Sequence, residues 1–196
     1  MPEKSITGMA RIVSMPQEML NDAKWYLSQA EQAAIKDPQS FALWREVRAT
    51  VMFAIASIES FINGNAHVFL RGNGSLDQAT KDYLTESRTR YKKGSLETEP
   101  NAFVALEEKL TGWTKVMAGK EFPHADKVWK DFKDVLDFRN ELVHFKVESS
   151  SQVYAKGDVT MANRAVEAAQ AIIERFYQTL GNPVPGWVRA AYREIK

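Results

Sequence analysis

Three polar side chains stand close together near the end of an otherwise apolar helical segment. Arg139, Asn140 and His144 place a guanidinium, an amide and an imidazole within six residues of sequence. An imidazole exchanges protons near neutral pH, whereas a guanidinium stays charged and binds a carboxylate or phosphate through two parallel hydrogen bonds. The question of function therefore starts from this segment.

The position of Arg139 on its helix allows two interpretations. At about 100° per residue it falls in the middle of an apolar arc, which is formed by Val128, Phe132, Val135, Leu136, Leu142 and Val143. A buried arginine is costly unless it is paired or lines a polar cleft. In a structural interpretation Arg139 pairs with a carboxylate and His144 caps the helix end, where a cation is favoured. In a functional one, Asn140 and His144 meet one turn apart on the flank of the arc.

The sequence Arg139-Asn140-Glu141-Leu142-Val143-His144 resembles the Arg-Asn-x-x-x-His signature of the HEPN superfamily. Its setting is similar too, late in a helix that follows a longer helix with an internal acidic residue. HEPN domains are compact helical bundles, commonly dimeric. Many are metal-independent endoribonucleases of toxin–antitoxin, abortive-infection and CRISPR systems, and some have lost activity. The resemblance covers residues 15–181, and residues 182–196 form a tail that packs on this domain or on a partner.

The resemblance implies a homodimeric ribonuclease that uses neither a metal nor another cofactor. His144 would move the proton of the ribose 2′-hydroxyl, and Arg139 would stabilise charge on the phosphate. Asn140 would orient the imidazole or bind a phosphate oxygen. The expected partners are RNA, a second copy of the chain, and an antitoxin or a nucleotidyltransferase.

Arg139 and His144 point about 140° apart on a regular helix. They converge only if the arginine curls round, the helix distorts, or a second subunit contributes. The resemblance favours the last, because the two motifs of a HEPN dimer typically face one cleft. Two other classes of function stay open. One is a non-catalytic HEPN-like module that binds RNA, a nucleotide or a protein, and the other is a helical dimer in which an Arg139–Glu59 pair only fixes packing.

Glu59, Asn63 and His67 form a second line of polar residues, spaced one turn apart on a long helix. Glu59 lies at the edge of an apolar face, so we expect it to pair with Arg139 across the bundle. Such a pair would be a structural ion pair or a support that tunes the site. Asn63 can join the same cluster, while His67 is expected to be exposed. A metal site that combines Glu59, His67 and His144 would need a geometry that nothing in the sequence supports.

The densest basic cluster is a candidate RNA-binding patch. It comprises Arg88, Arg90, Lys92 and Lys93, with Tyr91 among them. In one interpretation it is the solvated end of a helix. In the other its cations contact phosphates and Tyr91 stacks on a base.

Composition limits the class of protein. A chain of 196 residues with 44% hydrophobic and 26% charged residues suits one globular domain. The net charge of +1 excludes a strongly basic nucleic-acid arm. The absence of cysteine excludes disulfides, thiolate metal ligands and a cysteine nucleophile. The first residues lack a signal peptide and the apolar tracts are too short to span a membrane, so we expect a cytoplasmic protein.

Helical periodicity predicts an all-α, HEPN-like single-domain bundle of about five to six helices. Trp25, Trp44, Trp113 and Trp129 occupy apolar helical positions and are expected in the core. Asn63-Gly64-Asn65 is a candidate kink or break. A loop or short hairpin is expected over 148–157, and connections over 71–74 and 93–100. The expected helices are 16–35, 41–70, 76–91, 102–118 with Asn101 as its cap, one from Pro123 to about Phe145, and 160–180.

Overall fold

Two long helices open the fold where the sequence predicts them. The computed structural model describes residues 14–92, 95–100, 104–144 and 150–192, with the backbone alone at 88–92, 95–100, 150 and 152. Helix α1 spans Met15–Lys36 and α2 spans Phe41–Gly72. The hydroxyl of Ser40 accepts a hydrogen bond from the Leu43 amide at 3.1 Å and so caps α2.

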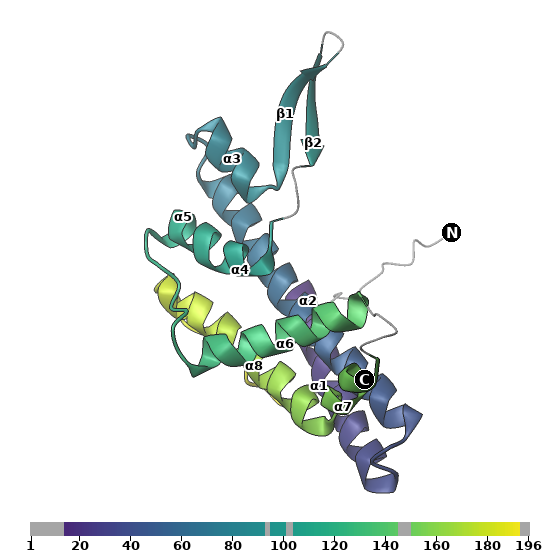
Figure 1. Ribbon diagram of the computed structural model, residues 1–196. Coiled ribbons are helices and arrows are strands. Elements are labelled where there is room, and N and C mark those ends of the chain that lie inside the picture. The colour runs from purple at the N-terminus through teal and green to yellow at the C-terminus, as the bar shows by residue number, and fades with distance from the viewer. Residues whose placement is uncertain (1–13, 93–94, 101–103, 145–149, 193–196) are drawn as a thin grey trace, which may run out of the picture.

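Helix α2 passes through the centre of the bundle and contacts α1, α6 and α8 (Figure 1). It runs without a break through Asn63-Gly64-Asn65, where the sequence left a break open. Ile62 and Ala66, on either side of the glycine, are buried and tie this turn to the core. Tertiary packing therefore outweighs the low helix propensity of Gly64.

One apolar core fills the space between the helices. Trp44 and Trp113 are buried as expected, Trp129 is half-buried, and Trp25 is wrongly assigned to the core, because it is 37% exposed on α1. The largest buried apolar side chains are Trp113, Phe122, Phe132, Phe138, Phe176, Leu20, Ile58, Ile62, Leu110, Ile172 and Ile173.

The segment after α2 differs from the expected helix over 76–91. Helix α3 covers only Gln78–Leu84, and strands β1 (Ser87–Lys92) and β2 (Ser95–Pro100) pair as an antiparallel hairpin. The predicted helix through Tyr91 and the predicted connection over 93–100 are therefore wrong. Glu86 has a φ of 51°, a left-handed conformation that ends the helical path. Figure 1 shows the hairpin extending beyond α3, away from the other helices.

The sequence of β1 explains its strand conformation in retrospect. Thr89 and Tyr91, which favour strands, alternate with the basic residues Arg88 and Arg90. In the register of the hairpin Arg88 stands opposite Glu99, and Arg90 stands opposite Glu97.

Helix α4 (Leu106–Glu108), a π-helical turn (Lys109–Trp113) and α5 (Thr114–Ala118) form one continuous helical stretch. It begins later than the predicted Ala102, because Val104 and Ala105 are not helical. The cap expected at Asn101 lies outside the described residues. Gly119 closes the stretch with a φ of 64°, as its position predicts.

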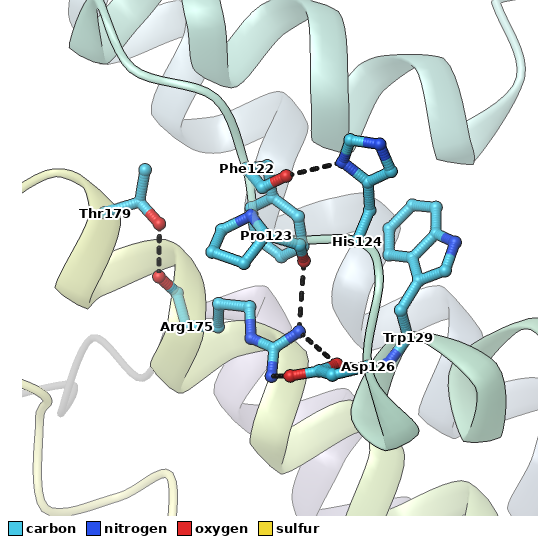
Figure 2. A network of polar contacts seen from close by, with 7 residues as sticks. All are labelled: Phe122, Pro123, His124, Asp126, Trp129, Arg175 and Thr179. Carbon is cyan, nitrogen blue, oxygen red and sulfur yellow. Dashed lines mark hydrogen bonds and ion pairs between the residues drawn. The ribbon is translucent and has the colours of Figure 1, made fainter.

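Helix α6 spans Lys127–Val143 and starts after a polar network that Figure 2 shows. The expected start at Pro123 is wrong, because the carboxylate of Asp126 caps the helix by accepting from the Trp129 amide at 3.2 Å. Arg175 donates to both Asp126 oxygens at 2.8 and 2.5 Å, and to the Pro123 carbonyl at 3.0 Å. The hydrogen bonds that Asp126 accepts, chiefly those from Arg175 and then that from the Trp129 amide, lower the pKa of its carboxyl. They fix the entry of α6 against α8.

Two helices complete the bundle. Helix α7 (Ser150–Lys156) occupies the region where a loop or short hairpin was expected, so that expectation is wrong. Tyr154 of α7 packs its ring against Trp44, with centroids 4.4 Å apart. Helix α8 spans Val159–Thr179 and is followed by Gly181 at a φ of 73°, in agreement with the sequence.

The residues after α8 lie against α1 and α8. Val188 is fully buried, and its carbonyl accepts from Lys24 of α1 at 3.1 Å and from Gln170 of α8 at 2.8 Å. Arg189 forms an ion pair with Glu174. Residues 184–190 are thus part of the folded unit.

The all-α class is confirmed, with the β1–β2 hairpin as an addition to the helices. Each expected helix is present, although several begin or end elsewhere, and α7 is additional. None of the helices in the described part of the chain is both long and apolar enough to cross a membrane.

Two glycines give opposite predictions for stability. A Cβ at Gly157 would overlap the ring of Trp44, so Gly157→Ala is expected to lower the free energy of unfolding by about 1–3 kcal/mol. A Cβ at Gly64 meets nothing, and Gly64→Ala should raise that free energy by about 0.5–1 kcal/mol. Urea denaturation of both variants checks this. A stable Gly157→Ala protein would show that α7 can shift away from Trp44.

Candidate functional site

Arg139 and Asn140 line a cleft between α2, the start of α4 and α6. Its volume is about 130 Å3. Both apolar and charged residues form its wall, which comprises Ile55, Glu59, Ala105, Leu106, Glu107, Lys133, Leu136, Asp137, Arg139 and Asn140. The structure therefore brings Arg139, Asn140 and Glu59, all singled out in the sequence, to one place.

The amide of Asn140 holds the guanidinium of Arg139. Nη1 of Arg139 donates to Oδ1 of Asn140 at 3.0 Å, and both side chains are half-buried. The sequence left Asn140 free to meet His144 one turn later, but its amide oxygen is directed to Arg139 instead. A guanidinium has five N–H donors, and those that make no hydrogen bond within the described residues can bind an anion.

Arg139 differs from the other cations around this cleft. Lys133 forms an ion pair with Glu107, whose hydrogen bond, together with the charges of Glu107 and Asp137, raises the pKa of the Lys133 ammonium. Lys109 pairs with Glu59 behind the cleft wall. Arg139 has no carboxylate within 4.0 Å in the described part of the chain, so its charge is not neutralised by a direct partner.

His144 lies at the end of α6 and is not among the residues that line the cleft. Its backbone amide donates to the Asn140 carbonyl at 2.9 Å, and its side chain is exposed. Val143, expected on the buried arc, is 48% exposed as well. The end of α6 thus presents an imidazole and an apolar side chain to the surroundings of the monomer.

Glu59 does not pair with Arg139, contrary to the sequence prediction. Its Oε1 lies 3.6 Å from Nζ of Lys109, which also donates to Asn63 Oδ1 at 3.2 Å and to Glu86 Oε2 at 2.9 Å. The Lys109 side chain is 1% exposed. The buried ammonium of Lys109 loses more hydration than the half-buried guanidinium of Arg139, so it has the greater need of an acceptor. Glu59 therefore pairs with Lys109.

The backbone around Lys109 is unusual on both sides. Lys109 begins the π-helical turn, in which Gly112 leaves room for the Tyr83 hydroxyl to pass. Glu86, with its left-handed φ, accepts from the Val104 amide at 3.0 Å through its other oxygen. Single π-helical turns and left-handed non-glycine residues are both enriched at functional sites.

A second cleft of about 300 Å3 lies next to this cluster. It is lined by Asn63, His67, Leu70, Leu84, Thr85, Glu86 and Trp113. The line Glu59–Asn63–His67 on α2, noted in the sequence, therefore borders both clefts. His67 is exposed, as expected.

The basic cluster has a different setting from the predicted helix end. Arg88, Arg90 and Lys92 lie on β1, and Lys93 lies outside the described residues. In the backbone register Arg88 stands opposite Glu99 and Arg90 opposite Glu97. RNA binding by this cluster stays a prediction. The described residues contain no group of three or more His, Asp or Glu side chains placed to hold a metal ion.

The sequence did not single out Lys109 or Glu86. Lys109 follows Glu107 and Glu108, and three consecutive charged residues are typical of an exposed segment. Its spacing from the buried Leu106, Leu110 and Trp113 is that of a single helical face, so only its charge argued against burial. Glu86 gave no signal because its role depends on the hairpin, which was itself missed.

Lys109→Ala should lower the free energy of unfolding by about 3–5 kcal/mol, because two carboxylates and an amide would lose the cation that they surround. Lys115→Ala is a matched control, since it removes an exposed pair with Glu121 and should cost about 0–1 kcal/mol. Chemical denaturation of the two variants measures the difference. Equal stabilities would mean that solvent replaces the ammonium at no cost.

Comparisons with models of known protein families, with curated proteins and with solved structures find no match for this chain. The resemblance of residues 139–144 to the HEPN motif therefore depends on the residues themselves. Their setting is Arg139 and Asn140 in a cleft, with His144 exposed at the end of the same helix.

Proposed function

We propose that this protein is a metal-independent endoribonuclease of the HEPN type, acting as a homodimer in a toxin–antitoxin or phage-defence role. The observation that carries the proposal is the state of Arg139. Its guanidinium is held in a cleft by Asn140, while no carboxylate neutralises it in the described part of the chain. A half-buried cation fixed in this way is suited to bind a phosphate.

Cleavage of RNA without a metal needs proton transfer and stabilisation of negative charge on the phosphate. A base takes the proton from the ribose 2′-hydroxyl, whose oxygen attacks phosphorus, and an acid returns a proton to the departing 5′-oxygen. The products are a 2′,3′-cyclic phosphate and a 5′-hydroxyl end. His144 takes the 2′-hydroxyl proton and, as an imidazolium, returns it to the 5′-oxygen, while Arg139 stabilises the charge that builds on the phosphoryl oxygens.

A second subunit supplies the group that one chain cannot bring to the cleft. His144 is exposed at the end of α6, about 140° round the helix from Arg139. In a two-fold dimer the His144 of one copy can face the Arg139 of the other, because each residue of such an interface meets its counterpart reciprocally. The exposed Val143 gives this contact an apolar component. Binding of an antitoxin or a nucleotidyltransferase to the same surface would block the site.

One observation favours an alternative in which the cleft binds without catalysis. His144 is absent from the cleft lining within one chain, so a monomer has a phosphate-binding arginine but no proton-transfer group beside it. The protein would then be a HEPN-like module that binds RNA, a nucleotide or a protein partner. Wild-type protein that leaves structured and single-stranded RNA intact in EDTA, and that does not slow growth when expressed, would establish this alternative.

Arg139→Ala should slow RNA cleavage in EDTA by about 10²–10³-fold, since a donor to the charged transition state is lost. The free energy of unfolding should change by less than about 1 kcal/mol, because no buried ion pair is broken. Lys130→Ala, which removes an exposed cation from the same helix, should keep full activity. Loss of several kcal/mol on Arg139→Ala, with cleavage retained, would assign the arginine to packing.

Complementation tests the shared site. Arg139→Ala and His144→Ala proteins, each inactive alone, should regain about a quarter of wild-type activity when unfolded together and refolded as a mixture, because half of the dimers then hold one intact site. Gel analysis of labelled RNA measures the recovery. A mixture as inactive as its components would show that each site draws both residues from one chain.

A further inference from the structure

The second cleft combines apolar walls with a polar edge. Leu70, Leu84 and the Trp113 ring form the apolar surface, while Asn63, His67, Thr85 and Glu86 provide polar groups. Its volume of about 300 Å3 suits a small planar molecule. The mechanism proposed for Arg139 and His144 does not use this cleft.

Several uncommon features converge on it. The π-helical turn ends at Trp113, the left-handed Glu86 lies in its lining, and the buried Lys109 binds two of its residues from behind. Trp113 is 1% exposed, and its indole Nε1–H is a buried donor without an acceptor in the described part of the chain. A buried donor left unpaired is costly, so this group indicates a site whose ligand is an acceptor.

The free hydrogen-bonding groups define the ligand. Asn63 uses its oxygen on Lys109 and keeps its amide N–H donors, and the His67 ring makes no hydrogen bond within the described residues. Glu86 accepts one bond at each oxygen, and each oxygen can accept another. The ligand therefore has acceptors for the indole and the amide, and a donor for the carboxylate.

The charge of the described side chains around this cleft disfavours an anion. Its described lining contains no lysine or arginine, and the ammonium of Lys109, which contacts two lining residues, is already surrounded by oxygens of Glu59, Asn63 and Glu86. Two carboxylates against one ammonium leave the cluster with an excess negative charge. A phosphate would be repelled here, in contrast to the cleft that contains Arg139.

We propose that this second cleft binds a nucleobase that carries an exocyclic amine, and that it selects the base next to the bond that is cut. The inference rests on the proposed ribonuclease function. A base stacks against the apolar wall, accepts from the Trp113 indole and the Asn63 amide, and donates its amine to Glu86, as carboxylates do with amino bases. Uracil fits less well, because it has no amine and flanks its single N–H with two carbonyl oxygens.

The two clefts are spaced for adjacent parts of one RNA strand. Glu59 borders the first and His67 the second, eight residues apart on α2, or about 12 Å along the helix axis. The base in the second cleft then belongs to a nucleotide close to the phosphate at Arg139. The length of α2 between Glu59 and His67 thus sets the distance between the phosphate position and the base position.

The test measures base binding separately from cleavage. Adenosine, cytidine and uridine are titrated into the full-length Arg139→Ala protein, and the indole N–H signal of Trp113, assigned with Trp113→Phe, is followed by NMR. Adenosine and cytidine should shift this signal, and uridine should need at least about a fivefold higher concentration. An unmoved signal with all three nucleosides, or an equal shift with inorganic phosphate, overturns the proposal.

Variants on α2 provide the controls. His67→Ala should weaken adenosine binding by about five- to tenfold, whereas Val68→Ala, an exposed neighbour outside the cleft, should leave it unchanged. Equal effects of the two would contradict the assigned site. Because nucleosides lack a phosphate and the titrated protein lacks Arg139, failure of RNA cleavage would leave this binding intact, and failure of this binding would leave cleavage intact.

Discussion

A buried ammonium group must be surrounded by acceptors, and the arrangement around Lys109 meets that requirement by joining three separate segments. Glu59 and Asn63 come from α2, Glu86 comes from the turn before β1, and Lys109 itself comes from the π-helical turn. The same contacts fix where the hairpin begins and separate the two clefts along α2. They also occupy Glu59, and this leaves Arg139 without a direct carboxylate partner in the described part of the chain. The guanidinium of Arg139 is therefore available to a ligand because the buried Lys109 binds Glu59.

Periodicity and end signals were sufficient for most of the fold. Gly119 and Gly181 end the helices before them where their residue types predict. The errors have a common cause. The strand at Ser87–Lys92 is stabilised by its pairing with Ser95–Pro100, and such pairing depends on a partner that a local window does not contain. The short helix α7 packs Tyr154 onto Trp44, a contact between distant parts of the chain.

The residues that meet at the candidate site could be predicted from the sequence, but their hydrogen bonds and ion pairs could not. Spacing placed Glu59 and Asn63 on one line of α2, and the motif placed Arg139 on a neighbouring helix, so their meeting at adjoining clefts followed from the helices alone. The choice of Glu59 between Arg139 and Lys109 depends on how deeply each cation is buried, which is a property of the folded chain. The side-chain oxygen of Asn140 likewise accepts from Arg139 at 3.0 Å rather than meeting His144.

The π-helical turn amounts to one residue more than an α-helix of the same length would hold. Removing a residue from Lys109–Trp113 would restore regular α-helical winding and place Lys109 three residues before Trp113 instead of four. Nζ of Lys109, which now lies 5.0 Å from the centre of the Trp113 ring and donates to Glu86, would have to meet both groups from a different turn geometry. In evolutionary terms a single-codon insertion or deletion could therefore adjust the clefts on α2 without any change in the residues that line them.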